Sequence, residues 1–313
     1  MSRAAGLMDL ERLKGARATI VEVGPRDGLQ NESASISTAD KIAFVDRLSA
    51  ARLPVVEVSA FVSPKWVPQM ADAAEVFAGI TKAPGIRYSA LVPNVAGLER
   101  AMNAGVTEVA IFAASTETFS RKNINQSIAE SLGTYEAVCK QALAAGLRVR
   151  GYLSTAFGCP YEGIVSPEVV VALTTRLLEI GVFEVAVSDT IGVANPAQVQ
   201  RVLERLLLAV PPRQLALHLH DTRGTALANV LAALPFGITT FDASAGGLGG
   251  CPYAPGAAGN LATEDLIYLL NGLGVETGVL LDRVVEASAF IEARLNHPLP
   301  SRYFHAARAA SRR

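Results

Sequence analysis

The sequence predicts an α/β fold, a single (β/α)8 TIM barrel with a short C-terminal helical extension. Short runs rich in β-branched residues alternate with longer segments rich in Ala and Leu, which is the pattern of βαβ units and a parallel sheet. Eight such units fall within about 250 residues, the usual size of a closed barrel. The alternative is a doubly wound open sheet, but no Gly-x-Gly-x-x-Gly pattern follows the first strand to support it.

The elements follow one another regularly along the chain. The predicted strands span residues 18–23, 55–59, 87–92, 108–112, 148–153, 183–188, 215–219 and 239–242. The predicted helices span residues 38–51, 70–80, 95–104, 128–145, 167–180, 196–210, 226–234 and 264–273. Gly105, Gly146 and Gly181 follow three of these helices, where glycine accepts a left-handed conformation at low cost. Ser166-Pro167 and Asn195-Pro196 place a capping residue and a proline at two helix starts.

The same pattern predicts how the chain is divided. Residues 1–17 lead into the first strand, residues 18–273 form the barrel, and residues 274–313 form a C-terminal helical extension with a basic tail. An amphipathic stretch over 280–295 predicts a helix in that extension. The extension is too short to form a second domain of its own.

Composition and charge exclude several classes of protein. The chain has 313 residues, 50% hydrophobic and 18% charged, so it can bury a large core and is not intrinsically disordered. A formal net charge of -1 argues against nucleic-acid binding through bulk electrostatics. The longest uncharged stretches are interrupted by Gly, Pro and Asn, so no membrane span is expected. Three cysteines without a Cys-x-x-Cys pair, and an N-terminus without a secretory signal, predict a cytoplasmic protein.

Polar side chains cluster where the predicted strands end. The active site of such a barrel lies at the C-terminal ends of its strands, so residues there are candidates for chemistry. These candidates are Arg26, Asp27, Glu57, Asn94, Ser154, Asp189, His218, His220, Asp221, Cys251 and Asn260.

The two histidines predict a metal site. His218 and His220 are two positions apart on a strand, so their side chains point to the same side. Asp27, after the neighbouring first strand, adds a carboxylate and gives a mixed nitrogen and oxygen site for a divalent ion such as Mg²⁺, Mn²⁺ or Zn²⁺. The alternative is a pair of histidines hydrogen-bonded within a polar layer of the barrel. Two of the chain's four histidines occur here, which favours the metal site.

Other candidates also have two interpretations each. A buried Glu57 needs a cationic partner, and Arg26 is the candidate. Arg26 and Asp27 form either part of a functional loop or a surface ion pair with each other. Cys251 follows a run with four glycines in five positions, and is either a small buried residue or an acid or nucleophile on a mobile loop. Asn260 either contributes to the site or caps the helix that follows it.

The motifs around these candidates resemble the 3-hydroxy-3-methylglutaryl-CoA lyase family over residues 19–295. The matching segments are 21–32 (VEVGPRDGLQNE), 63–70 (SPKWVPQM), 189–193 (DTIGV), 218–221 (HLHD), 246–253 (GGLGGCPY) and 259–265 (GNLATED). Arg-Asp-Gly with His-x-His is shared with isopropylmalate and homocitrate synthases. The glycine-rich cysteine loop is what favours the lyase.

The resemblance implies cleavage of 3-hydroxy-3-methylglutaryl-CoA to acetoacetate and acetyl-CoA. It also implies an acyl-CoA substrate, a homodimer, and a divalent cation, Mg²⁺ or Mn²⁺. The metal ligands that it implies are Asp27, His218, His220 and Asn260. The catalytic residues that it implies are Arg26, Asp27, Glu57, Asp189, His218 and Cys251.

The implied retro-Claisen reaction gives each residue type a role. A base must take the proton of a tertiary hydroxyl, and Asp27 or Asp189, with or without His218, is the candidate. Arg26 can donate to the enolate oxygen while Glu57 holds it in place. A thiol such as that of Cys251, with a reference pKa of about 8.5, is mostly protonated at neutral pH and can protonate the enolate carbon.

Three other functions remain open at this stage. The first is a lyase for a longer-branched 3-hydroxyglutaryl-CoA, which differs only in the volume of the pocket. The second is a condensing synthase that runs related chemistry in the forward direction. The third is a catalytically silent barrel that serves as a binding subunit. Ser33, Ser188 and Arg223 depart from the common family pattern, but none of them is a candidate metal ligand.

Overall fold

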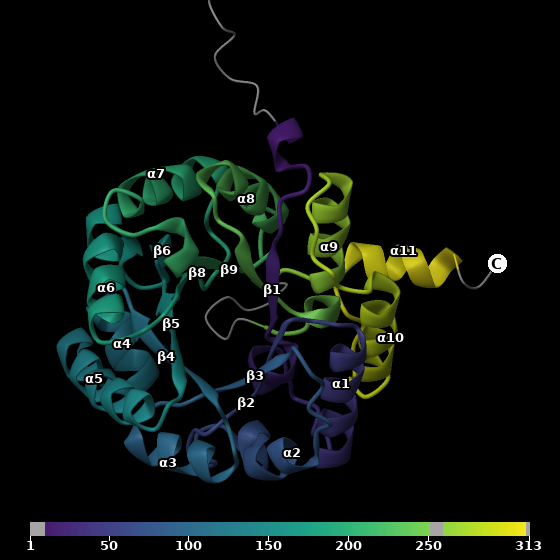
Figure 1. Ribbon diagram of the computed structural model, residues 1–313, viewed down its shortest axis with the longest axis horizontal. Coiled ribbons are helices and arrows are strands. Elements are labelled where there is room, and N and C mark those ends of the chain that lie inside the picture. The colour runs from purple at the N-terminus through teal and green to yellow at the C-terminus, as the bar shows by residue number, and fades with distance from the viewer. Residues whose placement is uncertain (1–9, 251–258, 311–313) are drawn as a thin grey trace, which may run out of the picture.

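The fold is a closed barrel of eight parallel strands surrounded by helices (Figure 1). The computed structural model describes residues 10–250 and 259–310. Around the barrel the strands run in the order β1-β10-β9-β8-β5-β4-β3-β2. Their bounds are β1 Thr19–Glu22, β2 Val55–Ala60, β3 Arg87–Leu91, β4 Glu108–Ala114, β5 Arg148–Ser154, β8 Val185–Asp189, β9 Leu215–Leu219 and β10 Thr240–Ala243. The predicted (β/α)8 barrel is confirmed. An antiparallel hairpin, β6 Gly158–Cys159 with β7 Gly163–Ile164, lies between β5 and α6.

Helices alternate with the strands and cover the outside of the barrel (Figure 1). The α-helices are α1 Thr38–Ala50, α2 Ala73–Gly79, α3 Val95–Asn103, α4 Glu117–Ile124, α5 Ile128–Ala144, α6 Pro167–Glu179, α7 Pro196–Leu206, α8 Ala226–Ala233, α9 Thr263–Gly272, α10 Leu281–Glu292 and α11 Arg302–Ala310. Short 3-10 turns are η1 Leu10–Leu13, η3 Pro68–Met70, η4 Pro212–Gln214, η5 Leu234–Phe236 and η6 Ala245–Gly247, and η2 Gly24–Gly28 is a single π-helical turn. Among the described residues, no helix is both long enough and apolar enough to cross a membrane.

The helix-end signals act as predicted. The side chain of Ser166 accepts a hydrogen bond from the Glu168 amide, and that of Asn195 from the Gln198 amide. The three glycines that follow helices have φ values between +74° and +104°, the left-handed region that glycine adopts readily. The helix expected over 280–295 is present as α10. Helix α4 was not predicted, because its sequence ETFSRKNI carries only two large apolar residues and shows no clear periodicity.

Strand register decides which side chains share the inside of the barrel. Partner residues in a parallel sheet point to the same side. Asp242 is the partner of His218, and His218 is the partner of Ser188, so these three side chains lie at one level. All eight strands run in the same direction, so the segments that follow β1, β8, β9 and β10 meet at one rim.

The C-terminal segment packs against the glycine-rich segment that follows β10. Gly246 has a φ of +66°, and a Cβ built there would lie 2.3 Å from Leu299 Cδ1. The side chain of Leu299 is fully buried, and the Ser301 amide donates a hydrogen bond of 3.0 Å to the Gly246 carbonyl. A residue with a side chain at position 246 would therefore displace the C-terminal segment.

Candidate active site

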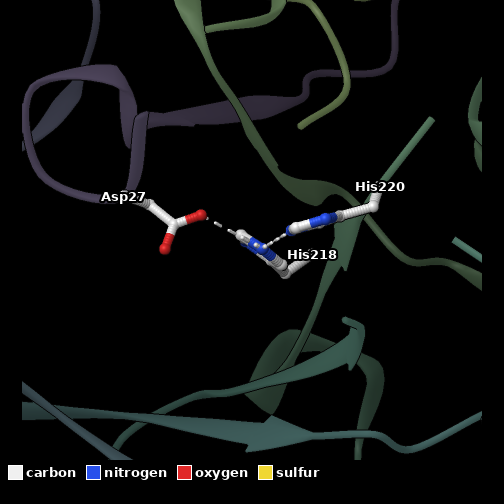
Figure 2. A group of neighbouring side chains, drawn as sticks. All are labelled: Asp27, His218 and His220. Carbon is white, nitrogen blue, oxygen red and sulfur yellow. Dashed lines mark hydrogen bonds and ion pairs between the residues drawn. The ribbon is translucent and has the colours of Figure 1, made fainter. Parts of the chain in front are cut away.

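Asp27, His218 and His220 come together at the rim of the barrel (Figure 2). One ligand atom from each of them lies within 4.8 Å of the others. The Nε2 atoms of the two histidines are 3.2 Å apart, and Asp27 Oδ2 is 3.8 Å from His218 Nε2. The structure thus brings together the three side chains that the sequence analysis grouped as a metal site.

Asn260 lies beside this cluster. It forms an isolated bridge with His220, and its Nδ2 donates a 3.0 Å hydrogen bond to Asp27 Oδ2. Its Oδ1 is buried and has no hydrogen-bond partner among the residues that the structure describes. Leaving such an atom unpaired costs about 1–3 kcal/mol, so the site favours a bound partner there. The alternative that Asn260 caps the next helix is wrong, because α9 begins at Thr263 with Ala262 as its N-cap.

The protonation states of the cluster suit a cation. Burial, together with the nearby His218, lowers the pKa of His220 to about 4, so its ring is neutral at pH 7. Burial would raise the pKa of Asp27, but Arg26 and the two histidines outweigh it and hold that pKa well below its usual range. Metal binding requires a charged carboxylate and neutral imidazoles, and the states of Asp27 and His220 meet this requirement.

The distances and donor atoms also fit a divalent ion. With bonds of about 2.1 Å, neighbouring ligands of an octahedral ion lie about 3.0 Å apart, close to the separation of the two histidine nitrogens. Two imidazoles, a carboxylate and an unpaired amide oxygen form a donor set that divalent ions accept. The residues that would hold the ion are Asp27, His218, His220 and Asn260.

Arg26 and Asp27 share the π-helical turn η2, which directly follows β1. The Arg26 Nη1 donates to Asp27 Oδ1 at 2.6 Å, and its Nε donates to Glu57 Oε1. The expected partner of Glu57 is therefore present. The alternative of a surface ion pair between Arg26 and Asp27 is wrong, because their side chains are only 8% and 18% exposed. Burial opposes the charge of Arg26, but Glu57 and Asp27 raise its pKa above the usual range.

Tyr152 completes this group and was missed by the sequence analysis. Its hydroxyl donates a 2.7 Å hydrogen bond to Glu57 Oε2. Its ring packs edge-on against that of His218, with the ring centroids 5.8 Å apart. Burial raises the pKa of Tyr152 well above its usual value, so it remains a hydrogen-bond donor at neutral pH. The available signal was the alternation in β5, where Arg148, Arg150, Tyr152 and Ser154 occupy every second position and the residues between them are apolar.

Behind His218 lies a second group that the sequence analysis missed. Asp242 Oδ2 is 3.2 Å from His218 Nδ1, and Arg150 holds the same carboxylate through Nη1 at 3.1 Å and Nη2 at 2.7 Å. Arg150 Nε in turn donates to Glu184 Oε1 at 2.9 Å. A carboxylate on one ring nitrogen fixes the orientation of a histidine and leaves the other nitrogen for a metal.

Asp189 lies at the end of β8, apart from the three-residue cluster. Its Oδ1 accepts a 2.9 Å hydrogen bond from the Val193 amide, and its Oδ2 accepts one of the same length from the Ala194 amide. Burial raises its pKa despite these bonds. The carboxylate thus holds the segment that leads into α7, and it is not one of the three side chains whose ligand atoms cluster.

A cavity of about 670 Å³ opens from the cluster toward the helices α4 and α5. This volume lies within the range of ligand-binding pockets. Arg26, Asp27, Tyr152, His218 and His220 line its base, and Gly250 also lines it. The outer wall is made by side chains from the segment after β2 and from α4 and its C-terminal end, including Trp66, Phe119, Lys122, Asn125 and Gln126. Cys251, the remaining candidate, lies outside the described residues.

Comparison with known proteins assigns the chain to a family. The HMGL-like family matches residues 17–291. Hydroxymethylglutaryl-CoA lyase YngG from Bacillus subtilis is 52% identical over 286 residues, which cover 91% of this chain and 96% of that protein.

Solved structures agree with this assignment. A crystal structure of HMG-CoA lyase from Bacillus subtilis superposes with a TM-score of 0.93 at 51% identity, covering 94% of this chain and 99% of that one. An HMG-CoA lyase from Acinetobacter baumannii, solved with coenzyme A and 3-methylmalate, superposes with a TM-score of 0.89 at 38% identity. The match covers 96% of this chain and 97% of that one. The chain therefore belongs to the HMGL-like family, among relatives named hydroxymethylglutaryl-CoA lyase, as its motifs predict.

Proposed function

We propose that this protein is a lyase that cleaves 3-hydroxy-3-methylglutaryl-CoA to acetoacetate and acetyl-CoA and that depends on a divalent cation. The observation that carries the proposal is the cluster of Asp27, His218 and His220 at the base of the cavity, in a chain 52% identical to a lyase of that name. The ligands are Asp27, His218, His220 and Asn260, and the cation is Mg²⁺ or Mn²⁺. When bound, such a cation polarises the hydroxyl and carboxylate oxygens of the substrate and lowers the pKa of the hydroxyl.

Deprotonation of the tertiary hydroxyl starts the cleavage. Asp27 lines the cavity and is charged at neutral pH, so it is placed to accept this proton. Asp189 suits the role less well, because it is not among the residues that line the cavity. We therefore assign Asp27 to proton transfer and Asp189 to holding the segment before α7.

Arg26 stabilises the negative charge that develops on the thioester oxygen. Its guanidinium lines the cavity and is held by Glu57, which Tyr152 holds in turn. A donor fixed in advance stabilises an enolate oxygen without reorganising during the reaction. Glu57 and Tyr152 therefore orient Arg26, and Glu57 balances its buried charge.

Cys251 is the proposed proton donor to the enolate carbon. This role rests on the sequence motif GGLGGCPY and on the ordinary acidity of a thiol. Exchange of Cys251 for alanine is expected to reduce the rate of acetyl-CoA formation without weakening metal binding. A rate equal to that of the unchanged protein would remove Cys251 from the mechanism.

The test of the function is release of acetoacetate from 3-hydroxy-3-methylglutaryl-CoA. The protein is stripped with a chelator and assayed with and without added Mg²⁺ or Mn²⁺. We expect turnover on the order of 1–10³ per second only with the cation. No product with either cation, from protein shown to be folded, would defeat the proposal, and a parallel assay with a longer 3-substituent would show whether the cavity prefers a bulkier substrate.

The assembly and location of the protein belong to the same proposal. We infer a homodimer, supported by the family resemblance, and a cytoplasmic location, supported by the low number of cysteines. Sedimentation at micromolar concentration tests the dimer. A single monomeric species would contradict it.

A further inference from the structure

A buried carboxyl group lies next to the candidate metal centre and contacts none of its ligands. Glu22, the last residue of β1, is fully buried. Its Oε1 accepts hydrogen bonds from the Gly24 amide at 2.9 Å and from the Ala245 amide at 2.8 Å. Its Oε2 accepts a 2.7 Å hydrogen bond from the Thr263 hydroxyl. One side chain thus joins the turn after its own strand to two segments that lie 223 and 241 positions further along the chain.

Each of the three segments leads directly to the candidate site. Gly24 is the first residue of the turn that carries Arg26 and Asp27. Ala245 begins the glycine-rich segment, in which the Leu248 carbonyl accepts a hydrogen bond from Asn260. Thr263 lies three positions after Asn260 and is the first residue of α9. This carboxyl group therefore links the segments that carry Asp27 and Asn260, in addition to the direct hydrogen bond between these two side chains.

The backbone at Gly24 packs closely against the carboxyl group of Glu22. A Cβ built at Gly24 would lie 2.6 Å from Glu22 Oε1, so a side chain there would push the carboxyl away. The next amide along the chain, that of Gly246, donates instead to Glu264 Oε2 at 2.8 Å. Glu264 also accepts a hydrogen bond from the Ser288 hydroxyl. Consecutive amides of the glycine-rich segment are therefore bound by two different buried carboxyl groups.

We propose that Glu22 is a positioning residue for the metal centre, which holds the turn of Asp27 and the segments around Asn260 in the arrangement that binds a cation. The inference rests on the proposed metal centre. It assigns a role in cation affinity to a residue that is not a ligand and that lines no part of the cavity.

The role depends on hydrogen bonding rather than on charge. Burial raises the pKa of Glu22 to about 7, against the effect of its three hydrogen bonds. Either protonation state keeps Oε1 as the acceptor for both amides, and the Thr263 hydroxyl can either donate or accept. Glu22→Gln keeps this arrangement, whereas Glu22→Met fills a similar volume and loses all three bonds.

The first measurement is Mn²⁺ affinity, from the spin-resonance signal of free Mn²⁺ during a titration. We expect about 10- to 100-fold weaker binding in Glu22→Met, the range typical of lost outer partners at metal sites, and rescue to within about threefold in Glu22→Gln. Glu108→Gln is the matched control, because Glu108 is a buried glutamate on the first residue of β4 whose partners are Arg87 and Arg148. Its affinity should equal that of the unchanged protein.

The second measurement is amide hydrogen exchange in the metal-free protein. Exchange at Gly24 and Ala245 should accelerate in Glu22→Met, while exchange at Gly246 should change less because Glu264 still binds it. If Glu22→Met does not fold, Thr263→Val removes one of the three bonds and should weaken Mn²⁺ binding by about fivefold.

The outcomes separate this inference from the proposed function. Folded Glu22→Met with unchanged Mn²⁺ affinity, or with unchanged exchange at Gly24 and Ala245, would overturn the positioning role. Normal Mn²⁺ binding by Thr263→Val, where that variant is used instead, would overturn it as well. Absence of Mn²⁺ binding in the unchanged protein would instead refute the metal centre, and with it the role of Glu22 there.

Discussion

The contact between Asp242 and His218 gives the sharpest prediction about the metal centre. In the intact protein His218 Nδ1 faces Asp242 Oδ2 at 3.2 Å, so the ring donates there and leaves Nε2 as the free ligand atom. In Asp242→Asn the new amide must satisfy both Arg150 and His218. Its oxygen turns toward the two Arg150 donors, its nitrogen faces the ring, and the proton of His218 moves to Nε2. We expect this tautomer to bind a cation poorly.

The magnitude follows from the contacts that are lost. Altering the outer partner of a metal-binding histidine costs about 10- to 100-fold in metal affinity, or about 1.4–2.7 kcal/mol. Arg150 also loses the charge that pairs with it, and removing one partner of a buried pair destabilises a protein by about 3–5 kcal/mol. Glu184→Gln is the control, because it removes the other charge beside Arg150 and leaves the contact between His218 and Asp242 in place.

The assay is calorimetric titration of both variants with Mn²⁺, after circular dichroism has shown that each is folded. Asp242→Asn should lose affinity, and Glu184→Gln should lose stability but keep its affinity. Equal affinity in Asp242→Asn and the unchanged protein would refute the argument from the tautomer. Equal weakening in both variants would show that the effect passes through Arg150 instead.

Three further predictions test the site and its surroundings. Asn260→Ala removes the unpaired buried oxygen and should weaken Mn²⁺ binding about 10-fold in the same titration; unchanged affinity would exclude it as a ligand. The pKa of His220 falls from 6.5 to about 4 on folding. The free energy of unfolding of the metal-free protein, measured by urea titration, should therefore fall by up to about 3 kcal/mol as pH drops from 6.5 to 4, at 1.36 kcal/mol per pKa unit. The same dependence on pH in His220→Gln would contradict this. Burial raises the pKa of Glu264 from 4.5 to about 8, so the stability that its protonated form contributes is lost as pH rises from 4.5 toward 8. The free energy of unfolding of Glu264→Gln should therefore exceed that of the unchanged protein by a few kcal/mol at about pH 8 but by little at about pH 5.

Local patterns in the sequence were sufficient to predict the barrel and the core of the site. Eight alternating strands and helices in about 250 residues are typical of a closed (β/α)8 barrel. Two histidines at alternate positions of a strand necessarily point to the same side of it. The pairing of Glu57 with Arg26 also follows from local rules, since a buried carboxylate requires a cation. These inferences needed only the strand ends and the parallel direction of the sheet.

The residues that were missed depend on contacts across the barrel. Arg150 and Asp242 are 92 positions apart, and only the register of four strands brings them together behind His218. The carboxyl group of Glu22 reaches Ala245, 223 positions away, for the same reason. Asp189 was predicted to follow a strand and is the last residue of β8, but its hydrogen bonds to two backbone amides depend on the path of the loop that follows.

The packing of Leu299 on Gly246 has a consequence for when the site forms during synthesis. The candidate ligands extend from Asp27 to Asn260, but the segment beside Asn260 is backed by Leu299, which leaves the ribosome after all of them. A nascent chain can pair its strands as they emerge, yet the contact that supports the glycine-rich segment forms only once Leu299 has been synthesised. The protein thereby acquires its chemistry after its architecture, and a chain that terminates before Leu299 would retain the barrel strands while lacking this support.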